Sequence, residues 1–267
     1  MIRDKAGKEI ALRAVRPNVG IEVAYRRKLF ALIREMQASY LYWLRVQYRE
    51  TPPRMAQDAT PAVELRRELR KLGIRWEKRF EEASPKLAAY FAKSAANRSD
   101  AALRSILKKG GWTVQFNLTS PVRDVLDATI TENVSHIKTI ASEYHTQVEG
   151  LVMRSVTAGR DLSFLTDELK KRYGITRRRA AFIARDQNNK ATAEVRRARE
   201  LDLGLETGIW LHSGGGKEPR PTHVRQNGKK FSVRDGWPDP ALKGKRIWPG
   251  TEPNCRCTWR PVVQGFS

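Results

Sequence analysis

The sequence predicts an α+β protein, in which an extended, mainly helical N-terminal region is followed by a small C-terminal α+β module with short antiparallel strands. Between residues 21 and 160 the apolar residues recur every three or four positions, which is the spacing of helices that bury one face. From Thr207 the sequence changes to short β-prone pieces separated by Gly, Pro and Asn turns. The predicted organisation is an N-terminal arm over residues 1–20, a long-helix region over 21–160 and the C-terminal module over 161–267.

Prolines and glycines divide the long-helix region. The first apolar stripe begins at Ile21 and ends at Thr51-Pro52-Pro53, because two consecutive prolines cannot continue the helical hydrogen-bond ladder. A second helix is expected over about 61–80. Ser84-Pro85 is expected to open a third, which ends near the glycines at 110 and 111.

The longest periodic segment begins at Ser120-Pro121, which predicts a helix start with proline at the first helical position. One apolar stripe then extends over about nine turns to Ser155. Beyond it the chain divides at a Tyr-Gly-Ile-Thr segment, where Gly174 is suited to ending one helix and Thr176 to capping the next. This pair of helices resembles a helix-turn-helix, although the same turn is common in helical hairpins.

Within the C-terminal module, Asn227-Gly228 is expected to form a hairpin turn between Val224 and Phe231. Trp237 and Trp248 lie among basic residues, an arrangement that allows stacking on single-stranded bases. We favour the alternative that these aromatic side chains close a small core.

The charge of the chain points to a polyanionic partner. There are 51 Lys and Arg residues against 29 Asp and Glu, a formal net charge of +22, and the pI is about 10.4. Such a field attracts nucleic acid and exceeds what solubility requires. No apolar stretch is long enough to span a membrane, and the charged N-terminus lacks the apolar middle region of a signal peptide. We therefore expect non-specific binding to double-stranded DNA and no membrane partner.

Three basic clusters are candidate DNA contacts. Residues 66–79 contain seven basic and two acidic residues, and residues 217–246 contain nine and three. The third cluster, Arg177 to Arg179, is expected at a helix start. Arginines there oppose the helix dipole, but a bound phosphate group would be stabilised both by the arginine side chains and by the exposed backbone amides. The predicted electrostatic DNA-binding set is Arg177, Arg178, Arg179, Arg196, Arg197, Lys229 and Lys230.

The chain has only two cysteines, Cys255 and Cys257, and two of its four histidines, His212 and His223, belong to the same module. These four residues are a legitimate tetrahedral zinc set. However, structural zinc sites usually place two to four residues between their cysteines. In a strand, residues two apart point to the same face, so both cysteines are expected to face inward. The sequence favours two core thiols and no cofactor, with zinc and disulfide or redox chemistry as the alternatives.

An alternative hypothesis is that the C-terminal module is a nuclease or toxin-like enzyme. His223 with Lys229, Arg220 and Asn254 could provide the acid–base and phosphate-binding groups of a nuclease. The acidic metal ligands that such enzymes need are scarce, since residues 212–257 contain only Glu218, Asp235, Asp239 and Glu252. We therefore expect no catalytic residues and no enzymatic activity.

The C-terminal half carries an ordered set of short motifs. They are the Ile-Ala-Arg ending at Arg185, a Gly-Ile strand with Trp210, an Arg-Pro-x-His segment from Arg220 to His223, the turn Asn227-Gly228-Lys229, and the closing Pro253-Asn254-Cys255-Arg256-Cys257. In order and spacing, residues 150–263 resemble the phage head morphogenesis family, the Mu F-like minor head proteins.

The resemblance implies a low-copy virion component that lies inside the head, contacts the portal protein and the major capsid or scaffold protein, and binds DNA without sequence preference. It would assist head assembly, packaging or ejection, and it would be in the host cytoplasm during assembly. The long helices would supply the portal or capsid contacts, and residues 161–267 would be the head morphogenesis domain.

Overall fold

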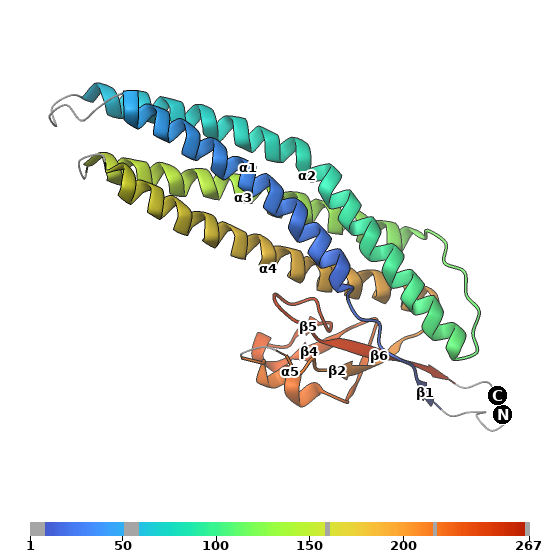
Figure 1. Ribbon diagram of the computed structural model, residues 1–267. Helices are drawn as coiled ribbons and strands as arrows, with labels where there is room; N and C mark the ends of the chain where they lie inside the picture. Colours follow the sequence, from blue (N-terminus) through green and yellow to red (C-terminus); the bar gives the residue numbers. More distant parts are fainter. Residues whose placement is uncertain (1–8, 51–58, 158–160, 216–217, 265–267) are drawn as a thin grey trace. The chain divides into compact units, whose positions relative to one another are not determined.

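The computed structural model describes residues 9–50, 59–157, 161–215 and 218–264, and it confirms the predicted fold class. Four long helices are followed by short antiparallel strands (Figure 1). The helices are α1 (Val19–Glu50), α2 (Ala59–Lys109), α3 (Ser120–Thr157) and α4 (Leu162–Asp202). No helix of the described ranges has an apolar stretch long enough to cross a membrane. The predicted stop at Thr51 lies outside the described residues.

Helix α2 is continuous, so the prediction of a new helix at Ser84-Pro85 was wrong. Proline lacks the N–H that would bond the carbonyl four residues earlier, which is that of Glu81. The Ser84 hydroxyl donates to this Glu81 oxygen at 3.1 Å and replaces the missing backbone donor. Burial of Phe80 and Ala88 on either side holds the helix against the core. Local compensation and packing therefore override the usual effect of the proline.

Helix α4 is also continuous, and the predicted division at Gly174 and Thr176 was wrong. Thr176 does not cap a helix; its hydroxyl donates to the Arg172 carbonyl at 3.0 Å within α4. A glycine inside a helix costs about 1 kcal/mol, but Thr176 and Ala180 are buried along the same stretch. There is consequently no helix-turn-helix here, and Arg177 does not lie at a helix start.

The chain forms two compact units, each assembled from separate stretches of sequence. One unit is a helical bundle built from Val23–Ala89 and Ile130–Ala184. Its parts of α1, α2, α3 and α4 run side by side (Figure 1). Buried hydrogen bonds join α1 to α3, from Tyr25 to Asn133 and from Tyr48 to Ser155, each at 3.0 Å. The apolar stripe of α3 faces this core through buried Ile137, Tyr144 and Val148.

The other unit comprises Met1–Glu22, Tyr90–Thr129 and Arg185–Ser267. Its larger sheet has the order β1-β6-β2-β3, with all described pairs antiparallel. The strands are β1 (Glu9–Ala11), β2 (Thr207–Leu211), β3 (Lys230–Ser232) and β6 (Thr258–Gln264). A second pair, β4 (Trp237–Asp239) and β5 (Lys245–Ile247), forms a two-stranded sheet, and a short 3-10 helix, η1 (Pro240–Leu242), lies between its strands.

Two local expectations in this unit need correction. Residues 1–20 were expected to form an arm, but β1 pairs with β6, and Leu12 and Val15 are buried beside Leu103 and Val263. Asn227-Gly228 does not join two strands. It follows the short helix α5 (Pro221–Gln226) and leads into β3, with Gly228 at a φ of 79°.

Candidate functional site

The segment before β6 is a tight turn that aims both cysteines at the same point. Asn254 has a φ of 59°, a left-handed conformation that asparagine tolerates better than most residues. The Cys255 amide donates to the Glu252 carbonyl at 2.9 Å and closes the turn. Residues 255–257 then run as irregular chain up to β6, and both cysteine side chains are buried. The prediction that both face inward is confirmed, although they precede the strand.

Side chains from α4 hold this turn in place. Arg185 donates to the Asn254 side-chain oxygen at 3.0 Å, and Asp186 accepts a hydrogen bond from the Asn254 amide. Asn189, one turn further along α4, donates to the Cys255 carbonyl at 3.0 Å. The conformation of the turn is therefore set by the helix against which it packs.

Helix α5 supplies the third side chain of the cluster. His223 is 2% exposed, and its Nδ1 lies 3.6 Å from the Cys255 sulfur and 3.7 Å from the Cys257 sulfur. On the opposite side of the ring, Nε2 lies 3.5 Å from Oδ2 of Asp239. Arg220, just before α5, donates to the Pro253 carbonyl at 2.8 Å and ties the start of this helix to the cysteine turn.

The two thiols share protons unequally. The pKa of Cys255 is lowered to about 4, because hydrogen bonds to its sulfur, of which that from the Cys257 thiol has the largest effect, outweigh the opposing effect of burial. The pKa of Cys257 is raised, because its thiol donates to Cys255 and is buried.

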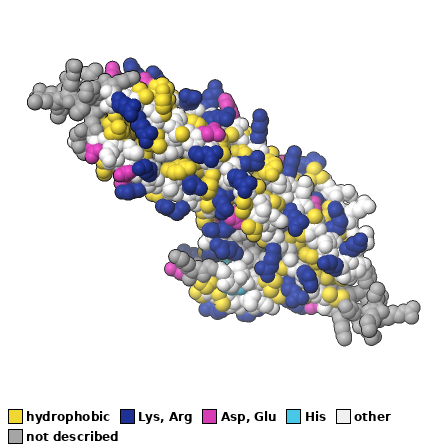
Figure 2. Space-filling view, in the orientation of Figure 1, with side chains coloured by type: hydrophobic (Ala, Val, Ile, Leu, Met, Phe, Trp, Pro, Cys, Tyr) yellow, Lys and Arg dark blue, Asp and Glu magenta, His cyan; other side chains and the backbone are white. Residues whose placement is uncertain are grey.

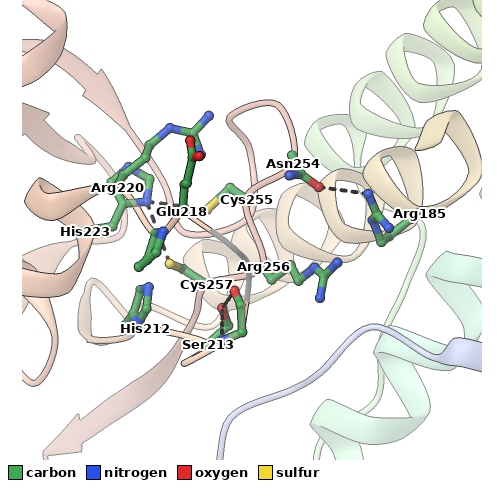
Figure 3. Close-up of a pocket in the computed structure, with 12 residues that line it drawn as sticks. Arg185, His212, Ser213, Glu218, Arg220, His223, Asn254, Cys255, Arg256 and Cys257 are labelled. Atoms are coloured by element: carbon green, nitrogen blue, oxygen red, sulfur yellow. Dashed lines mark hydrogen bonds between the residues drawn. The ribbon is translucent and has the colours of Figure 1, made fainter. Parts of the chain in front are cut away.

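A pocket of about 720 Å³ opens beside these groups (Figure 3). His223, Cys255 and Cys257 form part of its wall. The charged side chains around them are mainly basic, namely Arg185, Arg220 and Arg256 against Glu218 among the described lining residues, and the neutral polar groups come from His212, Ser213 and Asn254. Of the residues proposed for a nuclease, His223, Arg220 and Asn254 line the pocket, whereas Lys229 is not among its lining residues.

The remaining motif residues build the support for this pocket. Trp210 is fully buried in β2 and packs edge-on against His223, with ring centroids 5.2 Å apart. The Trp210 backbone bonds to Lys229 and Gly228 across the turn, at 2.9 and 2.8 Å. The Asn227 side chain accepts from the His212 amide at 2.9 Å. The dispersed motif thus converges on one structure around the cysteine turn.

Replacing Asn254 by Ala is expected to destabilise this unit by about 1–2 kcal/mol, because Ala is strained at a positive φ and cannot accept from Arg185. Replacing it by Gly removes the same side-chain bond without the strain and should cost less. Thermal unfolding and the reaction rate of the two thiols with a thiol reagent would measure both effects. Equal losses for the Ala and Gly variants would show that the turn conformation is not what the residue provides.

The predicted DNA-binding residues have different environments. Arg177 and Arg178 are exposed in the middle of α4, with the Arg177 guanidinium 4.4 Å from the Phe30 ring centroid. Arg179 is half-buried and pairs with Glu143. Lys229 and Lys230 are exposed. Figure 2 shows Lys and Arg side chains spread over most of the visible face, with far fewer acidic ones.

Arg196 does not belong in the DNA-binding set. It is 1% exposed, pairs with Glu200 at 2.5 Å, and its guanidinium lies 3.9 Å from the ring centroid of Trp259. A phosphate group cannot reach a side chain in this position. Its neighbour Arg197 is half-buried, pairs with Glu194 at 3.2 Å and stacks over Trp248. Sequence patterns could not predict this difference, because the two arginines are adjacent in a basic helix.

The aromatic residues of the module are part of its core. Phe231 is buried, and Trp237 and Trp248 pack partly buried against the same cluster, which includes Trp210 and Trp259. This arrangement favours the interpretation of core closure over stacking on single-stranded bases.

Comparisons with known proteins find similarity in the part of the chain that contains this site. The sequence model of the family described as "Phage Mu protein F like protein" matches residues 146–260. A protein of Haemophilus influenzae (strain ATCC 51907 / DSM 11121 / KW20 / Rd), described as "Uncharacterized protein", is 30% identical over 142 residues, or 53% of this chain. The chain covers 30% of the length of that relative. No solved structure shows a significant match.

Proposed function

We propose that the chain is a minor head protein of the Phage Mu protein F-like family, a low-copy virion component that acts at the portal vertex, because the sequence model of that family matches residues 146–260. The observation that carries the proposal is that the matched region contains the whole cysteine turn and its supporting motif, from Arg185 to Cys257. The partners in this proposal are the portal protein and the major capsid or scaffold protein.

The proposal includes non-specific binding of double-stranded DNA inside the head, in support of packaging or ejection. Its physical support is the net charge of +22, together with exposed arginines such as Arg177 and Arg178. Contact with packaged DNA requires neutralised phosphates and no reading of bases. Basic side chains spread over a surface, as on the face that Figure 2 shows, suit that task better than a single shaped groove.

The helical bundle is the proposed surface for portal or capsid contacts. The apolar stripe of α3 is already buried within the bundle, so it is not the contact surface. Large apolar side chains on the outside of α1 and α2 remain available, among them Tyr42 and Ile74, each 62% exposed. Such side chains supply anchors of the kind that protein interfaces use.

The test is to locate the chain in particles of the phage or prophage that encodes it. We expect mass spectrometry of purified particles to detect it at a few copies per particle, and cryo-electron microscopy of wild-type and deletion particles to differ at the portal vertex. Particles that lack the chain, or that carry it throughout the capsid lattice, would contradict the proposal.

The proposal assigns no enzymatic activity to the pocket. The competing hypothesis is a nuclease centred on His223, which is favoured by the meeting of His223, Arg220 and Asn254 at one pocket. Incubation of the purified chain with DNA and RNA, with and without divalent metal, separates the two. Cleavage that disappears in a His223→Asn variant would replace the structural role with the enzymatic one.

A further inference from the structure

The cluster of His223, Cys255 and Cys257 has the dimensions of a zinc site. The His223 Nδ1 atom lies 3.6 and 3.7 Å from the two cysteine sulfurs, and all three ligand atoms lie within 4.8 Å of one another. A tetrahedral zinc ion with Zn–S bonds of about 2.3 Å and a Zn–N bond of about 2.05 Å separates nitrogen from sulfur by about 3.6 Å. The two observed nitrogen–sulfur distances match the nitrogen–sulfur edges of that tetrahedron.

Hydrogen bonding alone explains the positions of the two sulfurs around His223 Nδ1 less well than a bound metal ion does. A neutral imidazole has one acceptor nitrogen, and two thiols point toward the same Nδ1 atom. Only one of them can donate to its single lone pair with good geometry. A metal ion satisfies all three groups together, because each contributes a lone pair to a common centre.

The far side of the histidine ring is arranged as in a metal site. Its Nε2 atom is buried without a hydrogen bond and faces the Asp239 carboxylate, with Nε2 and Oδ2 3.5 Å apart. That carboxylate is fixed by the Thr222 hydroxyl at 3.3 Å and the Ala241 amide at 3.0 Å. An Nε2–H directed at Asp239 leaves the lone pair on Nδ1, toward the two sulfurs. Histidine ligands of metals are usually oriented by a carboxylate in this way.

The charge of the donor set also suits a buried divalent ion. Two thiolates and one neutral imidazole balance the charge of Zn²⁺, so the occupied site adds no net charge to an already basic pocket wall. Sulfur and imidazole ligands select zinc over magnesium or calcium, which prefer oxygen. The Gly250 amide donates to the Cys255 sulfur at 3.4 Å, an additional bond that favours the thiolate form.

The short spacing between the cysteines was the argument against zinc from sequence. The structure removes it, because the left-handed Asn254 turns the chain before Cys255, and residues 255–257 present both sulfurs on one side. His212 lines the pocket but is not part of the three-residue group. Its Nδ1 accepts from the Gly214 amide at 3.2 Å.

We propose that this chain binds one Zn²⁺ ion through Cys255 Sγ, Cys257 Sγ and His223 Nδ1, with the fourth position facing the arginine-lined pocket and taken by solvent. The ion joins α5 to the turn before β6, two segments separated by about thirty residues. Asp239 is the positioning residue that orients His223. This role is independent of portal and DNA contact, so failure of either proposal leaves the other standing.

The test uses the full chain, produced without a histidine tag, kept reduced with a phosphine and supplied with zinc during expression. We expect about one zinc per chain by elemental analysis. After removal of zinc, Co²⁺ should give the thiolate charge-transfer band and the visible bands of a tetrahedral site. A reduced chain that holds no zinc and gives no such Co²⁺ spectrum would overturn the proposal.

Variants assign the ligands. Cys257→Ser and His223→Asn should each lower the affinity for Co²⁺ by at least about tenfold, and Asp239→Asn by about 10- to 100-fold. His212→Ala is the matched control, since it removes a pocket histidine outside the group, and its affinity and spectrum should equal those of the wild type. Loss of the spectrum in His212→Ala with retention in His223→Asn would also overturn the assignment. The wild-type Co²⁺ titration decides the matter even if a ligand variant fails to fold.

Discussion

The affinity of this chain for double-stranded DNA is expected to fall by about 10³–10⁵-fold between roughly 50 and 200 mM salt, provided that it neutralises about 6–10 phosphates. The physical reason is counterion release, since each basic side chain that contacts a phosphate displaces a condensed cation. Fluorescence anisotropy with two duplexes of unrelated sequence would measure the effect. The two salt slopes should be equal, because phosphate contacts carry no sequence information.

Charge-removing variants locate the contact. Replacing Arg177 and Arg178 by Gln should weaken binding to every sequence and reduce the salt slope by about 2. The matched control is Lys170→Gln with Lys171→Gln, which removes the same charge from two exposed positions of α4 that pair with Asp167 and Glu168. A flat salt response would exclude electrostatic binding. Equal losses in both variants would show that net charge, and not this stretch of α4, sets the affinity.

The Arg196→Met variant is expected to destabilise the sheet-bearing unit by about 3–5 kcal/mol. Arg196 and Glu200 are both completely buried, and Glu200 also accepts from the Trp259 indole at 2.6 Å. Burial lowers the pKa of Arg196 and raises that of Glu200, because each charge alone is unfavourable away from water. Removing the arginine leaves the carboxylate buried without its partner. Urea unfolding followed by tryptophan fluorescence would measure the loss.

Two further variants test the explanation. Arg197→Met removes the neighbouring, half-exposed arginine and should cost less than about 1 kcal/mol, as expected for a partly solvated ion pair. Adding Glu200→Gln to Arg196→Met should restore part of the stability, because it removes the uncompensated charge while keeping an acceptor for the indole. If Arg196→Met and Arg197→Met lower the free energy of unfolding by the same amount, the buried Arg196–Glu200 pair is not a major source of the stability of this unit.

The helices show how far local rules extend. Apolar periodicity predicted α1 and α3 closely, because burial of one face is a property of the helix itself. The same rules introduced breaks at Ser84-Pro85 and Gly174 that do not exist. Proline and glycine penalties are a few kcal/mol at most, and packing of the residues around them exceeds that cost. A local signal for a helix end therefore fails where tertiary burial continues through it.

For the candidate site, too, local patterns predicted one part and tertiary packing decided the rest. Spacing alone predicted that Cys255 and Cys257 face inward, and the order of short motifs predicted the similarity of residues 146–260 to the Phage Mu protein F-like family. The sequence did not reveal that the Asp239 carboxylate faces Nε2 of His223. It also did not reveal that Arg185 and Asn189, on a helix some 70 residues earlier, hold the turn that contains Cys255. These contacts join segments whose separation in sequence carries no periodic signal.

By itself the sequence determined the fold class, the basic charge, the inward-facing cysteines and the resemblance to a phage head family, since each depends on composition, on local periodicity or on the order of motifs. Only the tertiary structure decided that Arg196 is a core residue while Arg177 is exposed, and that β1 belongs to the C-terminal sheet. It also decided that one histidine, of the two in the module, meets both sulfurs. Burial and ligand geometry depend on which distant segments pack together, and local sequence patterns do not encode that choice.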